Sequence, residues 1–178
     1  MQDYISLAGK NGVALLDKGD CQFCGAKTKR GIHECVEIFN LGFQEIDFSS
    51  PENHIYRFLI VDAHTLQHPE IHGRWSNHYH LSRLHLIHKH QTNWTYKLSP
   101  KLSNYLNKYK QDKKDEYLES PERLKRGRLT TTDIKALSSD ELECKKLIRK
   151  WAQEVYESWE ACHHVADRIA REFLDQSY

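Results

Sequence analysis

The most regular hydrophobic pattern lies in the C-terminal part of the chain. Apolar residues recur at alternating steps of three and four, at Ile148, Ala152, Val155, Trp159, Cys162, Ala166, Ile169 and Phe173. This spacing follows the α-helical period, so these residues form one face of an amphipathic helix. The run Ser138-Ser139-Asp140-Glu141 before it is typical of a helix N-cap. The pattern predicts one long helix with a buried apolar stripe.

Three shorter helices are predicted upstream. From Cys35 to Phe43, apolar residues repeat at helical spacing. The next helix starts after the cap-like run Ser49-Ser50-Pro51-Glu52 and extends from about 54 to 68, because Pro69 disfavours the helical conformation at the residue before it. A third helix runs to about residue 90, with Leu81, Leu84 and Ile87 facing inward.

Four helices joined by strand-poor segments predict an all-α fold, a helical bundle of about four main helices. A chain of 178 residues suits one domain. We expect a loose, Gly-rich lead-in at 1–20 and a single helical domain at 21–178. That domain would include a small Cys-rich zinc knuckle at 21–35 and a charged connector at 97–128. The predicted core residues are Leu59, Leu66, Leu84, Trp151 and Trp159.

Composition narrows the functional classes only slightly. The formal net charge of +1 gives no global attraction to nucleic acid or membrane, and no run of about eighteen apolar residues predicts a membrane span. The segment Met1-Gln2-Asp3-Tyr4 has no features of a signal peptide. Five cysteines, an odd number, fit reduced thiols in a cytoplasmic protein better than a disulfide framework.

The connector is the most basic segment. Between residues 97 and 128, ten Lys and Arg residues stand against five Asp and Glu residues. We interpret it as a solvated, partly helical surface segment. A nucleic-acid-binding arm is the alternative, although Tyr105, Tyr109 and Tyr117 are too scattered to suggest a base-stacking series.

The strongest chemical signal is Cys21-Gln-Phe-Cys24-Gly25, followed by Cys35. Two thiolates three residues apart can bind one ion across a tight turn, so we predict that Cys21, Cys24 and Cys35 bind Zn²⁺. The fourth ligand would be His33 or a His from the bundle. Alternatively, Cys35 is a core thiol and the first pair is incidental. A redox role is weaker, because no βαβ pattern surrounds the pair.

Histidines on three predicted helices suggest a second site. His64 and His68 lie four residues apart, and Asp62 falls on an apolar stripe, where a carboxylate needs a partner. His80 and His163 lie on or beside the inward faces of two other helices. We predict that Asp62, His68, His80 and His163 converge in the bundle.

In such a site the His side chains would bind a metal with an open position, and Asp62 would act as a base or orient a ligand. The alternative is a set of hydrogen-bonded core or surface residues. Asp167 is expected to accept a hydrogen bond from His163, while His78, His85, His88 and His90 are expected to be mostly solvated.

A family resemblance spans Cys21 to about Arg168. It is carried by the Cys-x-x-Cys-Gly head, the core Val61-Asp62-Ala63-x-x-Leu66-Gln67-His68-Pro69, and further matches at His80-Leu81, Leu129-Thr130, Asp133, Trp151-Ala152, Val155 and Trp159 to His164. These residues resemble an uncharacterised bacterial family, a domain of unknown function. The chain departs from that family at His64, where Tyr is more usual, which favours His68 as the ligand. The bundle with scattered His is also similar, at fold level only, to DinB-type metal-dependent proteins.

Two functional classes follow. One is a metal-dependent enzyme, a hydrolase or transferase, with Asp62 and His68 as its catalytic residues. The other is a zinc-stabilised interaction module or accessory subunit that binds a protein partner or forms an oligomer, with nucleic acid as a weaker possibility and no membrane. The chain has no nucleophile elbow, phosphate loop or His-Glu-x-x-His motif to decide between them.

Overall fold

The computed structural model describes residues 4–43, 46–136 and 140–175, and within these residues the regular secondary structure is helical, apart from one isolated β-bridge between Gly19 and Arg30. It contains α1 (Tyr4–Lys10), α2 (Gly31–Leu41), α3 (His54–Gln67), α4 (Arg74–His88), α5 (Leu98–Asp112), α6 (Thr131–Ala136), α7 (Glu141–Ser158) and α8 (His163–Asp175), with 3₁₀ turns η1 (Pro51–Asn53), η2 (Pro69–Ile71) and η3 (Glu160–Cys162). The all-α prediction is confirmed. The expected count of four helices is too low, because short helices and a break in the last one were missed.

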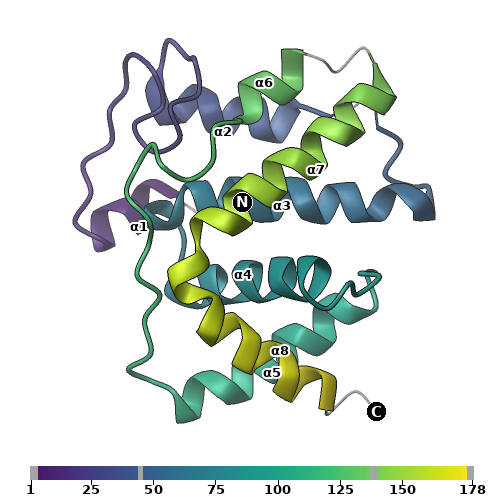
Figure 1. Cartoon of the computed structure of the whole chain (residues 1–178). Coiled ribbons are helices and arrows are strands. Elements are labelled where there is room, and N and C mark those ends of the chain that lie inside the picture. The colour runs from purple at the N-terminus through teal and green to yellow at the C-terminus, as the bar shows by residue number, and fades with distance from the viewer. Residues whose placement is uncertain (1–3, 44–45, 137–139, 176–178) are drawn as a thin grey trace.

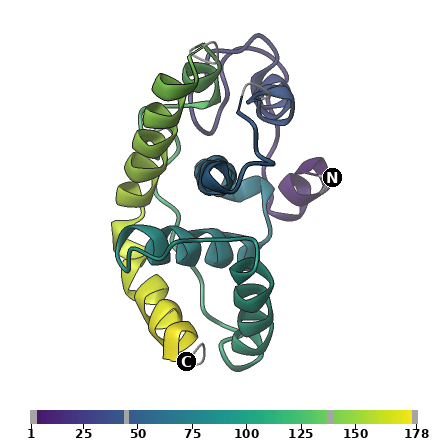
Figure 2. The same cartoon turned by 90° about the vertical axis from the view of Figure 1, so that its right-hand side faces the viewer.

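Helix α3 is the centre of the larger core. Helix α7 crosses it on one side and α4 packs against another (Figure 1). Figure 2 looks along α3 and shows the other helices arranged around it. The five predicted core residues belong to this cluster, and each is at most 1% exposed. The apolar stripes therefore identify the core correctly.

The predicted long C-terminal helix is interrupted at Trp159. Its backbone leaves the helical region (φ −94°, ψ 16°), and η3 separates α7 from α8. The break redirects the chain, so that α7 packs on α3 and α8 packs on α4. The apolar spacing continues unchanged through the 3₁₀ turn, which is why periodicity did not reveal it. At the start of α7 the Asp140 side chain accepts from the Glu143 N–H, as its cap-like position suggests, whereas Ser138 and Ser139 lie outside the described residues.

The lead-in, which was expected to be loose, and the connector, which was expected to be partly helical, each contain a helix. The lead-in includes α1, which packs against η2 and buries Ala8. The connector includes α5, whose buried residues Leu102, Tyr105, Leu106 and Tyr109 form a second core with α8. Within the described residues, no helix is both long and apolar enough to cross a membrane.

Gly31 starts α2 in a conformation that suits only glycine. Its φ is +56°, and an added Cβ would lie 2.2 Å from the carbonyl oxygen of Leu16. We predict that Gly31→Ala lowers the free energy of unfolding by more than about 1 kcal/mol, measured by urea denaturation. Gly9→Ala is the matched control, because Gly9 is helical and has open space around it, so that this change should stabilise by roughly 0.5–1 kcal/mol. Equal effects of the two variants would contradict the prediction.

Candidate metal centre

Three cysteines and one histidine meet in the interior. The His68 Nε2 atom lies 3.5 Å from Cys21 Sγ and 3.5 Å from Cys35 Sγ, and Cys24 Sγ lies 3.8 Å from Cys35 Sγ. All four ligand atoms lie within 4.8 Å of one another. The four residues are at most 7% exposed. This buried cluster could hold a metal ion.

Local sequence positions the first three ligands. The Gly25 N–H donates to Cys21 O at 2.8 Å, and Gly25 has a φ of 79°, so the chain turns tightly between Cys21 and Cys24. Cys35 lies on α2. Its sulfur also contacts the Thr131 hydroxyl at 3.6 Å, which connects the cluster to α6.

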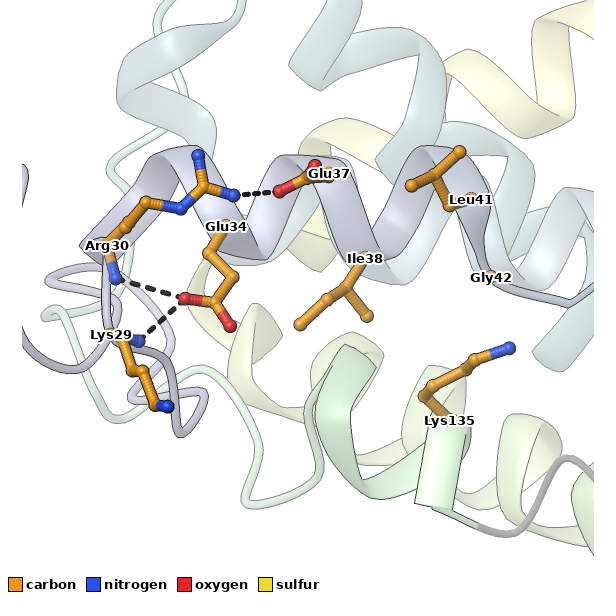
Figure 3. Close-up of a pocket in the computed structure, with 8 residues that line it drawn as sticks. All are labelled: Lys29, Arg30, Glu34, Glu37, Ile38, Leu41, Gly42 and Lys135. Atoms are coloured by element: carbon orange, nitrogen blue, oxygen red, sulfur yellow. Dashed lines mark hydrogen bonds and ion pairs between the residues drawn. The ribbon is translucent and has the colours of Figure 1, made fainter.

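A charged surface groove of about 430 Å³ lies between α2 and α6 (Figure 3). Some of its lining residues make hydrogen bonds at the start of α2. Glu34 accepts from the backbone N–H groups of Lys29 and Arg30 at 2.7 and 3.1 Å, and the Arg30 side chain pairs with Glu37. Such bonds satisfy donors that a helix N-terminus leaves open. These hydrogen bonds stabilise the start of the helix that carries Cys35. None of the predicted site residues lines the groove.

Pro69 places the fourth ligand. The residue before a proline is excluded from the helical region, and His68 has φ −126° and ψ 44° at the end of α3. The carbonyl oxygen of His64 can only accept, so the His68 Nδ1–H donates to it at 2.6 Å. That bond leaves the lone pair of His68 on Nε2, which faces the sulfurs.

His33, the nearer candidate, lies outside the cluster. Its Nδ1 is 2.7 Å from the Tyr4 hydroxyl instead. His33 is on α2, two residues before Cys35, and successive helical positions point in different directions. His68, a histidine of the bundle, is therefore the fourth residue of the cluster. This is the second of the two alternatives given for the fourth ligand.

The cluster concentrates negative charge in a buried place. Hydrogen bonds from the Cys24 and Cys35 thiols lower the pKa of Cys21, whereas the interaction with Cys21 raises the pKa of Cys24. Burial acts to lower the pKa of His68, but the Cys35 and Cys21 sulfurs outweigh it and raise that pKa to about 10. A cation placed among these atoms would offset thiolate charge, so the four residues could hold a metal ion.

Residues at and just after the end of the connector bond to Gln67, the residue before His68. Gln67 donates to the carbonyl oxygens of Arg126 and Leu129 at 2.9 and 2.8 Å, and accepts from Trp151 Nε1 at 3.1 Å. Arg126 donates to Gln67 O at 3.1 Å and forms an ion pair with Glu70. Sequence reasoning missed Gln67 and Arg126. The signal for Gln67 was its place in the family-like motif that ends at Pro69, next to His68.

Asp62 finds its partners on α4. It forms a buried ion pair with Arg83, whose Nε donates to Asp62 Oδ2 at 2.9 Å, and it bonds His80 Nδ1 at 2.6 Å. Asp62 is fully buried and Arg83 is 4% exposed. The expectation that this carboxylate needs a partner holds, although the sequence did not reveal Arg83.

The four residues expected to converge are distributed over three places. Both nitrogens of His68 are used in the cysteine cluster, whereas Asp62 and His80 pair with each other. His163 stacks on Tyr156 with ring centroids 4.1 Å apart, and its Nε2–H donates to Tyr156 O at 2.9 Å. Asp167 bonds His85 rather than His163, and both His78 and His85 are buried rather than solvated.

A small pocket adjoins the cysteine cluster. It has a volume of about 300 Å³, and its lining includes Tyr4, His64, His72 and His80. His64 stacks near His68, with centroids 4.2 Å apart, and burial lowers its pKa, which favours the neutral ring. The Nε2 atoms of His64 and His72 are buried without a hydrogen-bond partner. His64 therefore flanks the centre but is not one of its four clustered residues.

A comparison with protein families covers the segment that contains this cluster. A model of a family of unknown function, DUF5946, matches residues 19–160, which include the whole cluster. The chain belongs to this family. Neither a curated protein nor a solved structure matches it, so no activity can be transferred from a relative, and the likeness to DinB-type bundles stays a prediction.

The buried Asp62–Arg83 pair supplies a test of the interior. Removing one partner leaves an uncompensated buried charge, so Asp62→Ala should lower the free energy of unfolding by about 3–5 kcal/mol in urea denaturation. Glu122→Ala, which breaks an exposed pair with Lys125, should cost no more than about 1 kcal/mol. Similar costs for both variants would show that the buried pair has no special role.

Proposed function

We propose that this chain is a zinc-stabilised interaction module in which Cys21, Cys24, Cys35 and His68 bind one structural Zn²⁺ ion. The observation that carries the proposal is that four suitable ligands surround one buried point. Structural zinc sites have four protein ligands, whereas catalytic ones keep a position for water or substrate. A Cys₃His set is one of the common structural types.

The spacing of the ligand atoms favours zinc. Zn–S bonds of about 2.3 Å and Zn–N bonds of about 2.0–2.1 Å at tetrahedral angles imply ligand separations of roughly 3.8 Å between sulfurs and roughly 3.5 Å between sulfur and nitrogen. The separations are 3.8 Å for Cys24–Cys35 and 3.5 Å for each His68–Cys contact. Soft thiolates also select zinc over Mg²⁺ or Ca²⁺. Reduced thiols of this kind suit a cytoplasmic location.

Such an ion would join segments that are distant in the sequence. It would tie the turn at Cys21–Cys24 and helix α2 to the end of α3, beside the residues that hold α7 and the connector. A metal at this centre would therefore act on the fold. The enzyme alternative built on Asp62, His68, His80 and His163 loses support, because His68 has no nitrogen left for a second site.

Zinc content tests this centre directly. Protein purified without added metal should contain about one zinc per chain, and Cys24→Ser or His68→Ala should lose it. If the loss costs about 3 kcal/mol, the melting temperature should fall by roughly 6–12 °C. Elemental analysis and calorimetry make the two measurements.

The matched control is His33→Ala. It removes a histidine near the cysteines that bonds Tyr4 instead, so this variant should keep its zinc. Zinc retained by a Cys21→Ser/Cys24→Ser double variant would exclude the proposed centre. Loss of zinc from His33→Ala alone would exclude the choice of His68.

For the partner we propose a protein with an acidic surface. Lys97 lies directly before α5, Lys101 and Lys108 lie on its exposed face, and none of the three has an ion-pair partner among the described residues. Tyr105 and Tyr109, which a nucleic-acid platform would need for stacking, are at most 8% exposed. The tyrosines of α5 itself are buried, and the exposed Tyr96 and Tyr117 lie outside the helix, so its basic face favours carboxylates over bases.

Charge reversal tests this face. The wild type should bind a Glu-rich peptide with an affinity that falls as salt rises, and Lys97→Glu/Lys101→Glu/Lys108→Glu should weaken binding at least tenfold, measured by fluorescence anisotropy. The control triple Lys27→Glu/Lys125→Glu/Lys146→Glu changes the net charge equally at scattered exposed sites and should bind normally. Equal losses in both triples, or tighter binding of single-stranded DNA than of the peptide, would contradict the proposed partner.

A further inference from the structure

A second group of ligand atoms lies at the far end of α4. Asp167 Oδ1 on α8 is 3.3 Å from His85 Nε2 and 3.6 Å from His90 Nε2. The three atoms lie within 4.8 Å of one another. His90 follows α4, where Gln91 adopts a φ of 51° and the Thr92 N–H donates to Leu86 O, so the chain folds back toward the helix. Two imidazoles and one carboxylate thus meet without a cysteine.

The neighbours of these residues orient them as ligands. His85 Nε2–H donates to Asp167 Oδ1 at 3.3 Å, and the Tyr156 hydroxyl donates to His85 Nδ1 at 3.0 Å. A bound ion would take the place of the Nε2 proton, and His85 Nδ1–H would then donate to the Tyr156 hydroxyl. His90 Nε2 is buried and has no hydrogen-bond partner, because Asp167 Oδ1 is beyond bonding distance. The other oxygen of Asp167 is held by Arg171 at 2.7 Å. A bound ion would give the buried His90 Nε2 a partner beside the Asp167 carboxylate.

Two of the three residues of this cluster, His85 and Asp167, line a pocket. The pocket has a volume of about 370 Å³, and its lining includes His85, Lys89, His164, Asp167 and Arg171. Lys89 and Arg171 make its rim cationic. His163, stacked on Tyr156, forms one wall and has its Nε2 occupied by a backbone carbonyl.

We propose that His85, His90 and Asp167 bind a divalent transition-metal ion, with an open coordination position that takes a small anionic ligand. Two His and one carboxylate are a recognised ligand set for non-haem iron and for catalytic zinc, and both types leave positions free. The ion and the two cationic side chains would together attract a carboxylate or phosphate group. This site is independent of the cysteine centre in ligands and in location. His85, His90 and Asp167 would thus form the open metal site that was expected from His68, His80 and His163.

Cobalt binding tests the ion. Protein with its cysteine centre loaded with zinc should bind one further Co²⁺, with visible d–d absorption and without the intense near-ultraviolet thiolate band that a cysteine site gives. Asp167→Asn and His90→Gln should each weaken this binding at least tenfold in calorimetric titration. His164→Gln, which changes an exposed histidine of the same pocket, should leave it unchanged.

Two results would overturn the site: no Co²⁺ beyond the cysteine centre, or equal affinity in the wild type and His90→Gln. Asp167→Asn also breaks the Arg171 pair, so His90→Gln decides the matter if the Asp167 variant fails to fold. For the open position, inorganic phosphate or acetate should shift the cobalt spectrum of the wild type, and Lys89→Gln should weaken the shift. An unchanged spectrum with cobalt bound would exclude the anion.

Discussion

The departure of His68 from helix α3 is the constraint on which the N-terminal half of the molecule depends. Pro69 forces that departure, and the bond from His68 Nδ1 to His64 O then directs Nε2 at the cysteine sulfurs. The preceding residue, Gln67, is still helical and bonds the connector and Trp151. Two consecutive residues thus connect the cysteine turn, α3, α7 and the connector at one point. Any shift in the end of α3 would disturb all four.

Buried polar groups link the rest of the interior. Asp62 on α3 and Arg83 on α4 are both inaccessible, and each compensates the charge of the other. Arg83 also lies over the Phe58 ring, 4.9 Å from its centroid. Replacing such a pair by apolar residues is often neutral for stability, so we expect the pair to contribute to the specificity of the fold. It defines which faces of α3 and α4 meet, because any other register would bury an unpaired charge.

Sequence reasoning succeeded where the information is local. The spacing of Cys21, Cys24 and Cys35 indicated a metal site, and the stripes identified the core around Trp151 and Trp159. It could not select His68 over His33, because the fourth ligand comes from a helix 33 residues beyond Cys35. It placed Asp167 beside His163, one helical turn away, but a long-range contact with His85 prevails. Helical periodicity shows which residues share one face of a helix. It carries no information about which other helix that face packs against.

Near the break at Trp159 the buried apolar residues divide between two clusters, with Ala166 of α8 still in the larger one, while a third cluster surrounds the cysteines. Helix α7 belongs to the larger core with α3, which adjoins the cysteine centre, whereas the other buried residues of α8 belong to the smaller core with α5. Proteins open locally in cooperative units, and backbone hydrogen exchange reports the stability of each unit. We expect a chelator to accelerate exchange in α2, α3 and α7 while leaving α5 and α8 protected. The break in one helix would then make this small domain behave as two separately opening units.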